Sequence, residues 1–131
     1  MSHEASRRAL SVLLTVMGIT AVTTGLWAVI TGTGGMPGDV ATSPSTESEL
    51  RYFAAFWIAY GAAALLVAPR AERETAIVRG LALAMFVGSI ARAVAWIDVG
   101  RPHDLFVGLM VAEVVVPALI VTLQARVAAR R

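Results

Sequence analysis

The chain has 131 residues and a formal net charge of +2, and 57% of its residues are hydrophobic whereas only 15% are charged. Soluble domains are about 45–50% apolar and about 25% charged, so this composition excludes an ordinary soluble domain and favours a protein embedded in lipid. The sequence has no cysteine, which excludes disulfides and thiol chemistry, and its eleven cations are all arginines that mostly flank apolar runs, an arrangement that argues against nucleic acid as a partner.

Four apolar segments have the length of membrane-spanning helices. Each is close to the ~20 residues that cross about 30 Å of hydrocarbon at a rise of about 1.5 Å per residue. The connections after the second and third segments are short, and short connections place consecutive helices side by side and antiparallel. The sequence therefore predicts an all-α fold, an integral membrane up-down four-helix bundle that forms a single domain over residues 1–131. In chain order the predicted helices cover about residues 9–31, 50–68, 75–97 and 104–124.

Loop and capping signals separate these helices. A glycine-rich stretch, 32–39, cannot continue the first helix and opens a polar loop that reaches Ser48. Thr46 and Glu49 have the spacing of a capping box for the second helix. Pro69 is expected to end that helix, because proline lacks the backbone N–H that a continuing helix needs.

The arginines predict the orientation of the bundle. Most of them lie on the side of both termini, whereas Arg51 and Arg101 lie on the opposite, outer side among several acidic residues. Cytoplasmic loops are enriched in Arg and Lys, so both termini are expected in the cytoplasm. The alanine-rich, lysine-free composition is typical of a GC-rich bacterial genome, and we expect a multi-pass protein of the bacterial cytoplasmic (inner) membrane. The arginines on the side of the termini are Arg7, Arg8, Arg70, Arg73, Arg79, Arg126, Arg130 and Arg131.

Two further ionisable residues fall inside predicted helices, Arg92 in the third and Glu113 in the fourth. A charge near the bilayer centre is costly and usually faces a partner. Counted from Arg101 in the turn, Arg92 lies nine residues before and Glu113 twelve residues after. In antiparallel helices this difference of three residues corresponds to about 4.5 Å in depth, which an arginine side chain spans. The sequence therefore predicts an intramembrane ion pair; a structural role is the favoured interpretation, and a ligand or proton site is the alternative.

More residues are expected around this pair. Pro117 cannot donate to the carbonyl of Glu113, so Arg92 is a candidate to bind that carbonyl as well as the carboxylate. Tyr60, about midway through the second helix, is a candidate to add its hydroxyl. Small side chains are expected to let the third and fourth helices approach closely. These small residues are Gly80, Ala84 and Gly88 on the third helix and Gly108 and Ala112 on the fourth.

The outer turn between the third and fourth helices contains Asp98, Arg101, His103 and Asp104. One histidine and two aspartates are a weak signal for a metal, and capping of the fourth helix by Asp104 is the favoured explanation. We therefore predict no metal and no cofactor. An enzyme at this turn would require a metal bound by His103, and the sequence offers neither a nucleophile–base pair nor a phosphate-binding loop, so we expect that the protein is not an enzyme.

Several stretches resemble one family. Arg92-Ala-Val-Ala-Trp96, the turn Gly100-Arg-Pro-His103 and the later Phe106, Glu113 and Pro117 are similar to the core of a family of small bacterial four-span membrane proteins, catalogued as a domain of unknown function. The similarity extends to the second predicted helix and covers most of the chain. It supports the four-helix fold and brings no established activity.

The resemblance also implies that one set of polar residues belongs together. This set consists of Arg51, Arg92, Arg101, His103 and Glu113.

These observations favour a non-enzymatic accessory or stabilising subunit of a larger inner-membrane complex, with a lipid transporter as one candidate host. Its expected partners are membrane lipids and other integral membrane subunits. The alternative is a small transporter, or a lipid- or quinone-binding protein, with a cavity near Glu113. An unpaired Glu113 in an open cavity would favour the alternative, and a buried contact with Arg92 would disfavour it.

Overall fold

The computed structural model describes residues 2–38 and 41–128. Over these residues the chain is all-α, and its four long helices are each long and apolar enough to cross a membrane. The predicted helical class and the four apolar helices are therefore confirmed, while the orientation in the membrane stays a prediction. The elements are α1 (His3–Thr31), the 3-10 helix η1 (Gly32–Gly35), α2 (Pro44–Val67), the 3-10 helix η2 (Ala68–Arg70), α3 (Thr75–Val99) and α4 (Asp104–Ala128).

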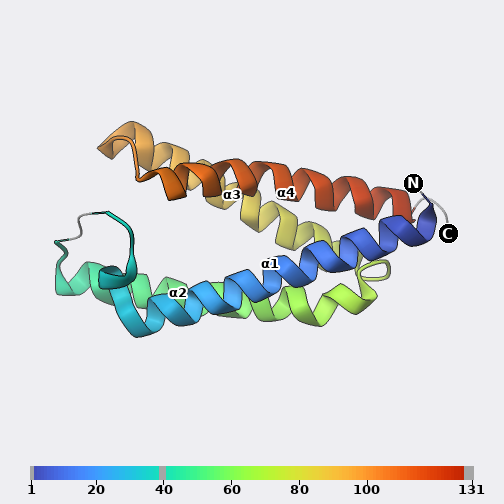
Figure 1. The fold of residues 1–131 in the computed structure, drawn as a ribbon, viewed down its shortest axis with the longest axis horizontal. Coiled ribbons are helices and arrows are strands. Elements are labelled where there is room, and N and C mark those ends of the chain that lie inside the picture. The colour runs from blue at the N-terminus through green and yellow to red at the C-terminus, as the bar shows by residue number, and fades with distance from the viewer. Residues whose placement is uncertain (1, 39–40, 129–131) are drawn as a thin grey trace.

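The helices form two hairpins, α1–α2 and α3–α4, that diverge from one another along the molecule (Figure 1). The start of α1, the end of α4 and the connection 71–74 lie at one end, which we call the terminal end. The opposite end carries η1 and the turn 100–103, and we call it the turn end. The two hairpins lie close together at the terminal end and are well separated at the turn end (Figure 1).

The hydrophobic core that joins the hairpins is confined to the terminal end. Leu10 and Leu14 of α1 are fully buried in one cluster with Val78 of α3 and Ile120 of α4. Each of these side chains lies in the half of its helix nearer the terminal end. The four helices therefore share a core over about half of their length. Beyond this core the two hairpins diverge (Figure 1).

Polar contacts reinforce the terminal end. Gln124 is fully buried, and its Nε2 donates to the carbonyl of Ala71 at 2.8 Å and to Oγ1 of Thr75 at 3.0 Å. The ring of His3 lies 3.3 Å from the carbonyl of Val127 through Nε2. These contacts bind the last turns of α4 to the α2–α3 connection and to the start of α1.

The α1–α2 hairpin is packed through glycines. A Cβ added to Gly61 would lie 2.7 Å from the carbonyl oxygen of Gly18 and 2.8 Å from the backbone nitrogen of Val22. A Cβ added to Gly25 would lie 3.0 Å from the carbonyl oxygen of Ala54. Both contacts are with backbone, which cannot move aside as a side chain can. The backbones of α1 and α2 therefore touch at Gly61, where only glycine fits, and approach each other closely at Gly25.

The structure differs from the prediction that small residues bring α3 and α4 into close contact. A Cβ added to Gly80, Gly88 or Gly108 meets nothing within 4 Å. Ala84 is exposed and Ala112 is only half-buried. The close glycine contact belongs to the first hairpin, because there the glycines of both helices lie on the faces turned toward each other.

The second helix begins earlier than the sequence analysis placed it. α2 starts at Pro44, and Ser43 caps it by accepting a hydrogen bond from the backbone N–H of Thr46 at 3.2 Å. The capping box predicted at Thr46 and Glu49 is therefore wrong, since both residues lie inside the helix. Serine at the cap followed by proline in the first turn is itself a strong start signal, and it lies in the stretch that looked like a loop.

Candidate functional site

The candidate site is the Arg92–Glu113 pair, which joins the two arms of the α3–α4 hairpin. The Nε atom of Arg92 donates to both carboxylate oxygens of Glu113, at 3.1 Å to Oε1 and 3.0 Å to Oε2. Arg92 lies seven residues before the end of α3 and Glu113 nine residues after the start of α4. These separations correspond to about 10 Å and about 13 Å from the turn end, so the pair lies well inside the apolar part of both helices.

The orientation of α4 explains why an acid is tolerated there. Glu113, Pro117 and Ile120 are all buried, and their spacing of four and three residues puts them on one face of the helix. Ile120 belongs to the core that joins the hairpins, so this face is turned into the bundle. Glu113 is the next buried position toward the turn end. The pair therefore lies just beyond the shared core, where the two hairpins begin to separate.

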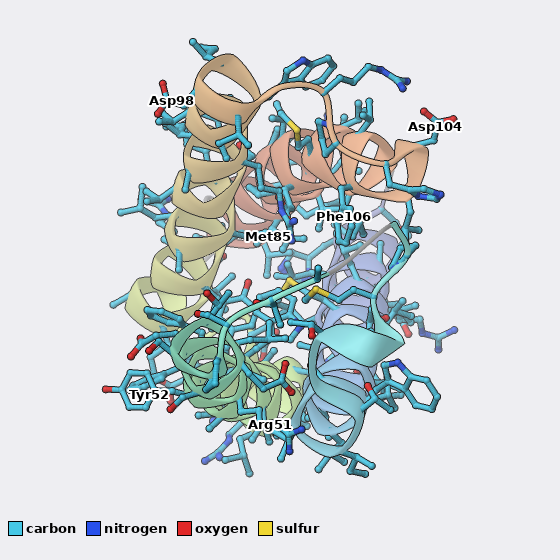
Figure 2. All side chains as sticks on the ribbon, turned by 90° about the vertical axis from the view of Figure 1, so that its left-hand side faces the viewer. Arg51, Tyr52, Met85, Asp98, Asp104 and Phe106 are labelled. Carbon is cyan, nitrogen blue, oxygen red and sulfur yellow. The ribbon has the colours of Figure 1, made fainter. Side chains whose placement is uncertain are left out.

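The two members of the pair differ in exposure. The side chain of Glu113 is only 9% exposed, whereas that of Arg92 is 39% exposed. The Arg92 guanidinium lies 5.6 Å from the centroid of the Phe106 ring, at a distance typical of a cation–π contact. Figure 2 looks at the molecule from the turn end and labels Phe106 and Met85 between the hairpins, with Asp98 and Asp104 at the periphery. Arg92 therefore contacts both an acid and an aromatic ring, and part of its side chain remains exposed.

Pro117 does not extend the network as expected. It is buried within α4, four residues after Glu113. Arg92 was a candidate to bind the Glu113 carbonyl that Pro117 leaves without its helical N–H. Among the described residues, the hydrogen bonds of Arg92 go to the carboxylate alone.

Tyr60 has a different role from the one expected. Its hydroxyl donates to the carbonyl of Leu81 at 2.9 Å and lies 3.4 Å from the sulfur of Met17. Its ring stacks on Trp57 at 4.9 Å between centroids. Tyr60 therefore connects α2 to α3 at the edge of the shared core and, within residues 2–38 and 41–128, forms no hydrogen bond with Arg92 or Glu113. The rotation of α2 about its own axis determines which residues Tyr60 can contact, and hydropathy does not specify that rotation.

The outer-turn residues do not converge. Arg101 forms an ion pair with Asp104, and both are exposed. The cap of α4 is His103, whose Nδ1 accepts from the backbone N–H of Leu105 at 3.2 Å, so the prediction that Asp104 caps the helix is wrong by one residue. Asp98 is exposed on the last turn of α3. Across residues 2–38 and 41–128, no three His, Asp or Glu side chains are grouped as metal ligands would be.

Arg51 lies in the other hairpin and not with Arg92. Its guanidinium donates to Glu47 at 2.8 and 3.0 Å and to the carbonyl of Val29 at 3.0 Å. Glu47 also accepts from the backbone and hydroxyl of Thr33, at 3.1 and 2.8 Å. The set implied by the resemblance is therefore divided between the hairpins, and Arg51 closes the turn end of α1–α2.

The glycine contact between α1 and α2 is the feature that sequence reasoning missed. Gly18, Ala21 and Gly25 are buried on α1, at intervals of three and four residues, opposite Ala54 and Gly61 of α2. This spacing is a signal for one small-residue face, and it is visible in the sequence.

A family model described as a domain of unknown function (DUF4345) matches residues 9–124. No curated protein and no solved structure matches the chain.

Proposed function

The chain belongs to the DUF4345 family, a domain of unknown function, and we propose that it acts as a non-enzymatic accessory subunit that stabilises a larger complex in the bacterial inner membrane. One observation carries the proposal. Among the described residues the two hairpins share a core only at the terminal end, and at the turn end their ribbons are well separated (Figure 1). A neighbouring membrane protein that packs where the hairpins separate would complete the contacts between them.

The polar group at the point where the hairpins separate supports the same proposal. Arg92 is 39% exposed inside a helix that is long and apolar enough to span the membrane. Charged groups in spanning helices usually face the interior of an assembly, because lipid cannot solvate them. Arg92 fits a protein whose interior is completed by another subunit.

The connections between the helices support a role inside the membrane. Residues 71–74 and 100–103 join consecutive helices directly, and neither connection has room for a folded domain. The contacts with a partner are therefore expected between helices. A lipid transporter remains one host class that fits a small protein of this kind, and the experiment below identifies the host without assuming it.

The state of Glu113 weighs against the rival function. A transporter, or a lipid- or quinone-binding protein that works through Glu113, needs this acid free to exchange a proton or ligand. Instead both carboxylate oxygens accept from Arg92 Nε, and the side chain of Glu113 is only 9% exposed. A paired, buried carboxylate fits a structural role.

The test is purification of the tagged protein at native expression levels in a mild detergent, followed by native electrophoresis and mass spectrometry. We expect the chain to migrate with a larger integral membrane partner at constant stoichiometry. A tagged, unrelated four-span protein from the same membrane is the control. Recovery of this chain alone, with no partner enriched over the control, contradicts the proposal.

The expected orientation is tested separately. A reporter active only in the cytoplasm, fused after residue 131, is expected to be active, whereas the same reporter in the 100–103 turn is expected to be silent. The opposite pattern contradicts cytoplasmic termini and leaves the subunit proposal standing.

A further inference from the structure

We propose that the two Nη atoms of Arg92 bind a neutral polar acceptor on a transmembrane helix of the partner subunit. The inference rests on the proposed function, and it names the atoms on this chain and the chemistry on the other. It starts from a count of donors. Arginine carries five N–H donors, and Arg92 uses only the one on Nε, which Glu113 accepts through both oxygens.

The four donors on the Nη atoms have no acceptor among residues 2–38 and 41–128. In water such donors are solvated, but inside hydrocarbon each donor without a partner costs several kcal/mol. Phe106 covers one face of the guanidinium, at 5.6 Å, and the ring accepts no conventional hydrogen bond there. An acceptor must therefore approach the free edge of the guanidinium from outside the described residues.

Depth decides between a lipid headgroup and a protein. The 25 residues of α3 span about 37 Å, so a helix centred in about 30 Å of hydrocarbon extends about 4 Å past each edge. The backbone of Arg92, about 10 Å from the helix end, then lies about 7 Å below the edge of the hydrocarbon. Arg92 cannot extend to the surface and keep its Nε on Glu113. Headgroup phosphates are too shallow, whereas a transmembrane helix presents polar atoms at any depth.

Charge decides the kind of acceptor. Arg92 and Glu113 together are neutral, and a second anion on the same guanidinium would leave a net negative charge in a medium of low dielectric constant. An amide, hydroxyl or backbone carbonyl satisfies the Nη donors and adds no charge. Asn, Gln, Ser and Thr side chains supply such acceptors between membrane helices.

Space permits this approach. Gly88 lies one helical turn before Arg92 on α3, and a Cβ added there meets nothing within 4 Å. The side chains of the described residues therefore leave room for a partner helix beside Gly88, one turn away from the guanidinium. The unmatched donors indicate the contact, and Gly88 only leaves room for it.

The decisive variant is Arg92→Lys, which keeps a cation for Glu113 but removes the second and third nitrogens of the guanidinium. We expect the protein to fold and the amount of co-purified partner to fall about tenfold, as expected for the loss of charge-assisted hydrogen bonds. Arg101→Lys, at the exposed turn, is the matched control and is expected to retain the partner. Wild-type stoichiometry in Arg92→Lys overturns the inference and leaves the proposed function intact, whereas absence of a partner from the wild type overturns both.

A second measurement keeps the test valid if Arg92→Lys does not fold. A photo-crosslinking amino acid replaces Gly88 in the otherwise unchanged chain, with the same replacement at Val12, exposed on α1, as control. We expect a crosslink to the partner from position 88 and none from position 12. Crosslinks to lipid alone at position 88, or native mass spectra in which Arg92→Lys loses a bound lipid or quinone while the partner stays, overturn the inference in favour of a small amphipathic ligand.

Discussion

The two hairpins of this protein hold their helices together in different ways. In α1–α2 the backbones touch through Gly18, Gly25 and Gly61, and the turn end is closed by Glu47 with Thr33. In α3–α4 the glycines Gly80, Gly88 and Gly108 face open space. Its arms are joined by the apolar core and the Gln124–Thr75 hydrogen bond at the terminal end, and by the Arg92–Glu113 pair toward the turn end. The first hairpin is packed backbone to backbone through its glycines, whereas the second has a charged contact between its arms beyond the shared core.

The difference matters because lipid weakens the usual driving force for helix association. Lipid tails are as apolar as leucine, so helices in a bilayer associate through close packing and polar contacts. α1–α2 buries its glycines Gly18, Gly25 and Gly61 between its own two helices. α3–α4 exposes its small residues and part of a charged group, which is the state expected of a hairpin that contacts another protein.

The largest effect is expected where backbone touches backbone. Gly61→Leu forces a side chain into Gly18 and Val22, whose backbone atoms already lie within 2.8 Å of the first added carbon. We expect a loss of more than about 3 kcal/mol in the free energy of unfolding, or no folded protein, because overpacking against backbone cannot be relieved by a rotamer change. Detergent unfolding curves provide the measurement.

The matched control is Gly80→Leu on α3, where the added carbon meets nothing within 4 Å. It is expected to change stability by less than about 0.5 kcal/mol. Equal losses for the two glycine variants would contradict the distinction between the hairpins.

A smaller effect is expected from breaking the charged contact. Glu113→Ala leaves the Arg92 cation without its acid and is expected to cost about 2–3 kcal/mol, less than for a fully buried pair because Arg92 is 39% exposed. The double variant Glu113→Leu/Arg92→Met removes both charges and is expected to be more stable than Glu113→Ala alone. Detergent melts that rank the two variants in the opposite order would show that the pair does not stabilise the hairpin.

The helices and the pair were predictable from sequence for clear physical reasons. A run of about 20 apolar residues is long enough to span hydrocarbon whatever its neighbours do, and loop signals separate the four runs. The depth of Arg92 and Glu113 follows from counting residues along two antiparallel helices at a fixed rise. Both inferences depend on distance along an axis, which sequence determines directly.

The errors concern rotation about the axis and the first residue of a helix. In water, hydropathy marks the buried face of a helix, but in a bilayer the lipid-facing and helix-facing sides are both apolar. The sequence therefore could not show whether Gly61 or Gly88 makes a close contact with a neighbouring helix. It also could not show that the Tyr60 hydroxyl binds the Leu81 carbonyl. At the start of α4, His103 and Asp104 are adjacent and both are capable of capping, so the prediction missed by one residue.

Tyr60 sharpens the comparison because it connects the hairpins. Tyr60→Phe removes the hydrogen bond to the Leu81 carbonyl and is expected to cost about 1 kcal/mol. Tyr52→Phe, on the exposed side of α2, removes the same atom from a residue that is 56% exposed and is expected to be neutral. Equal effects of the two variants in unfolding curves would mean that the Tyr60 hydroxyl does not hold α2 against α3.

The smallest effect is expected at the turn of α3–α4, and it distinguishes the two candidate caps. His103→Ala removes the acceptor of the Leu105 N–H and is expected to cost about 0.5–1 kcal/mol. His103→Asn is expected to restore the loss, because asparagine is among the preferred caps and its side-chain oxygen accepts the same kind of bond. Asp104→Ala removes the exposed ion pair with Arg101, and exposed pairs contribute little, so its effect is expected to be smaller than that of His103→Ala. If Asp104→Ala instead destabilises the protein more, and His103→Asn fails to restore the stability lost in His103→Ala, the side chain that caps α4 is that of Asp104.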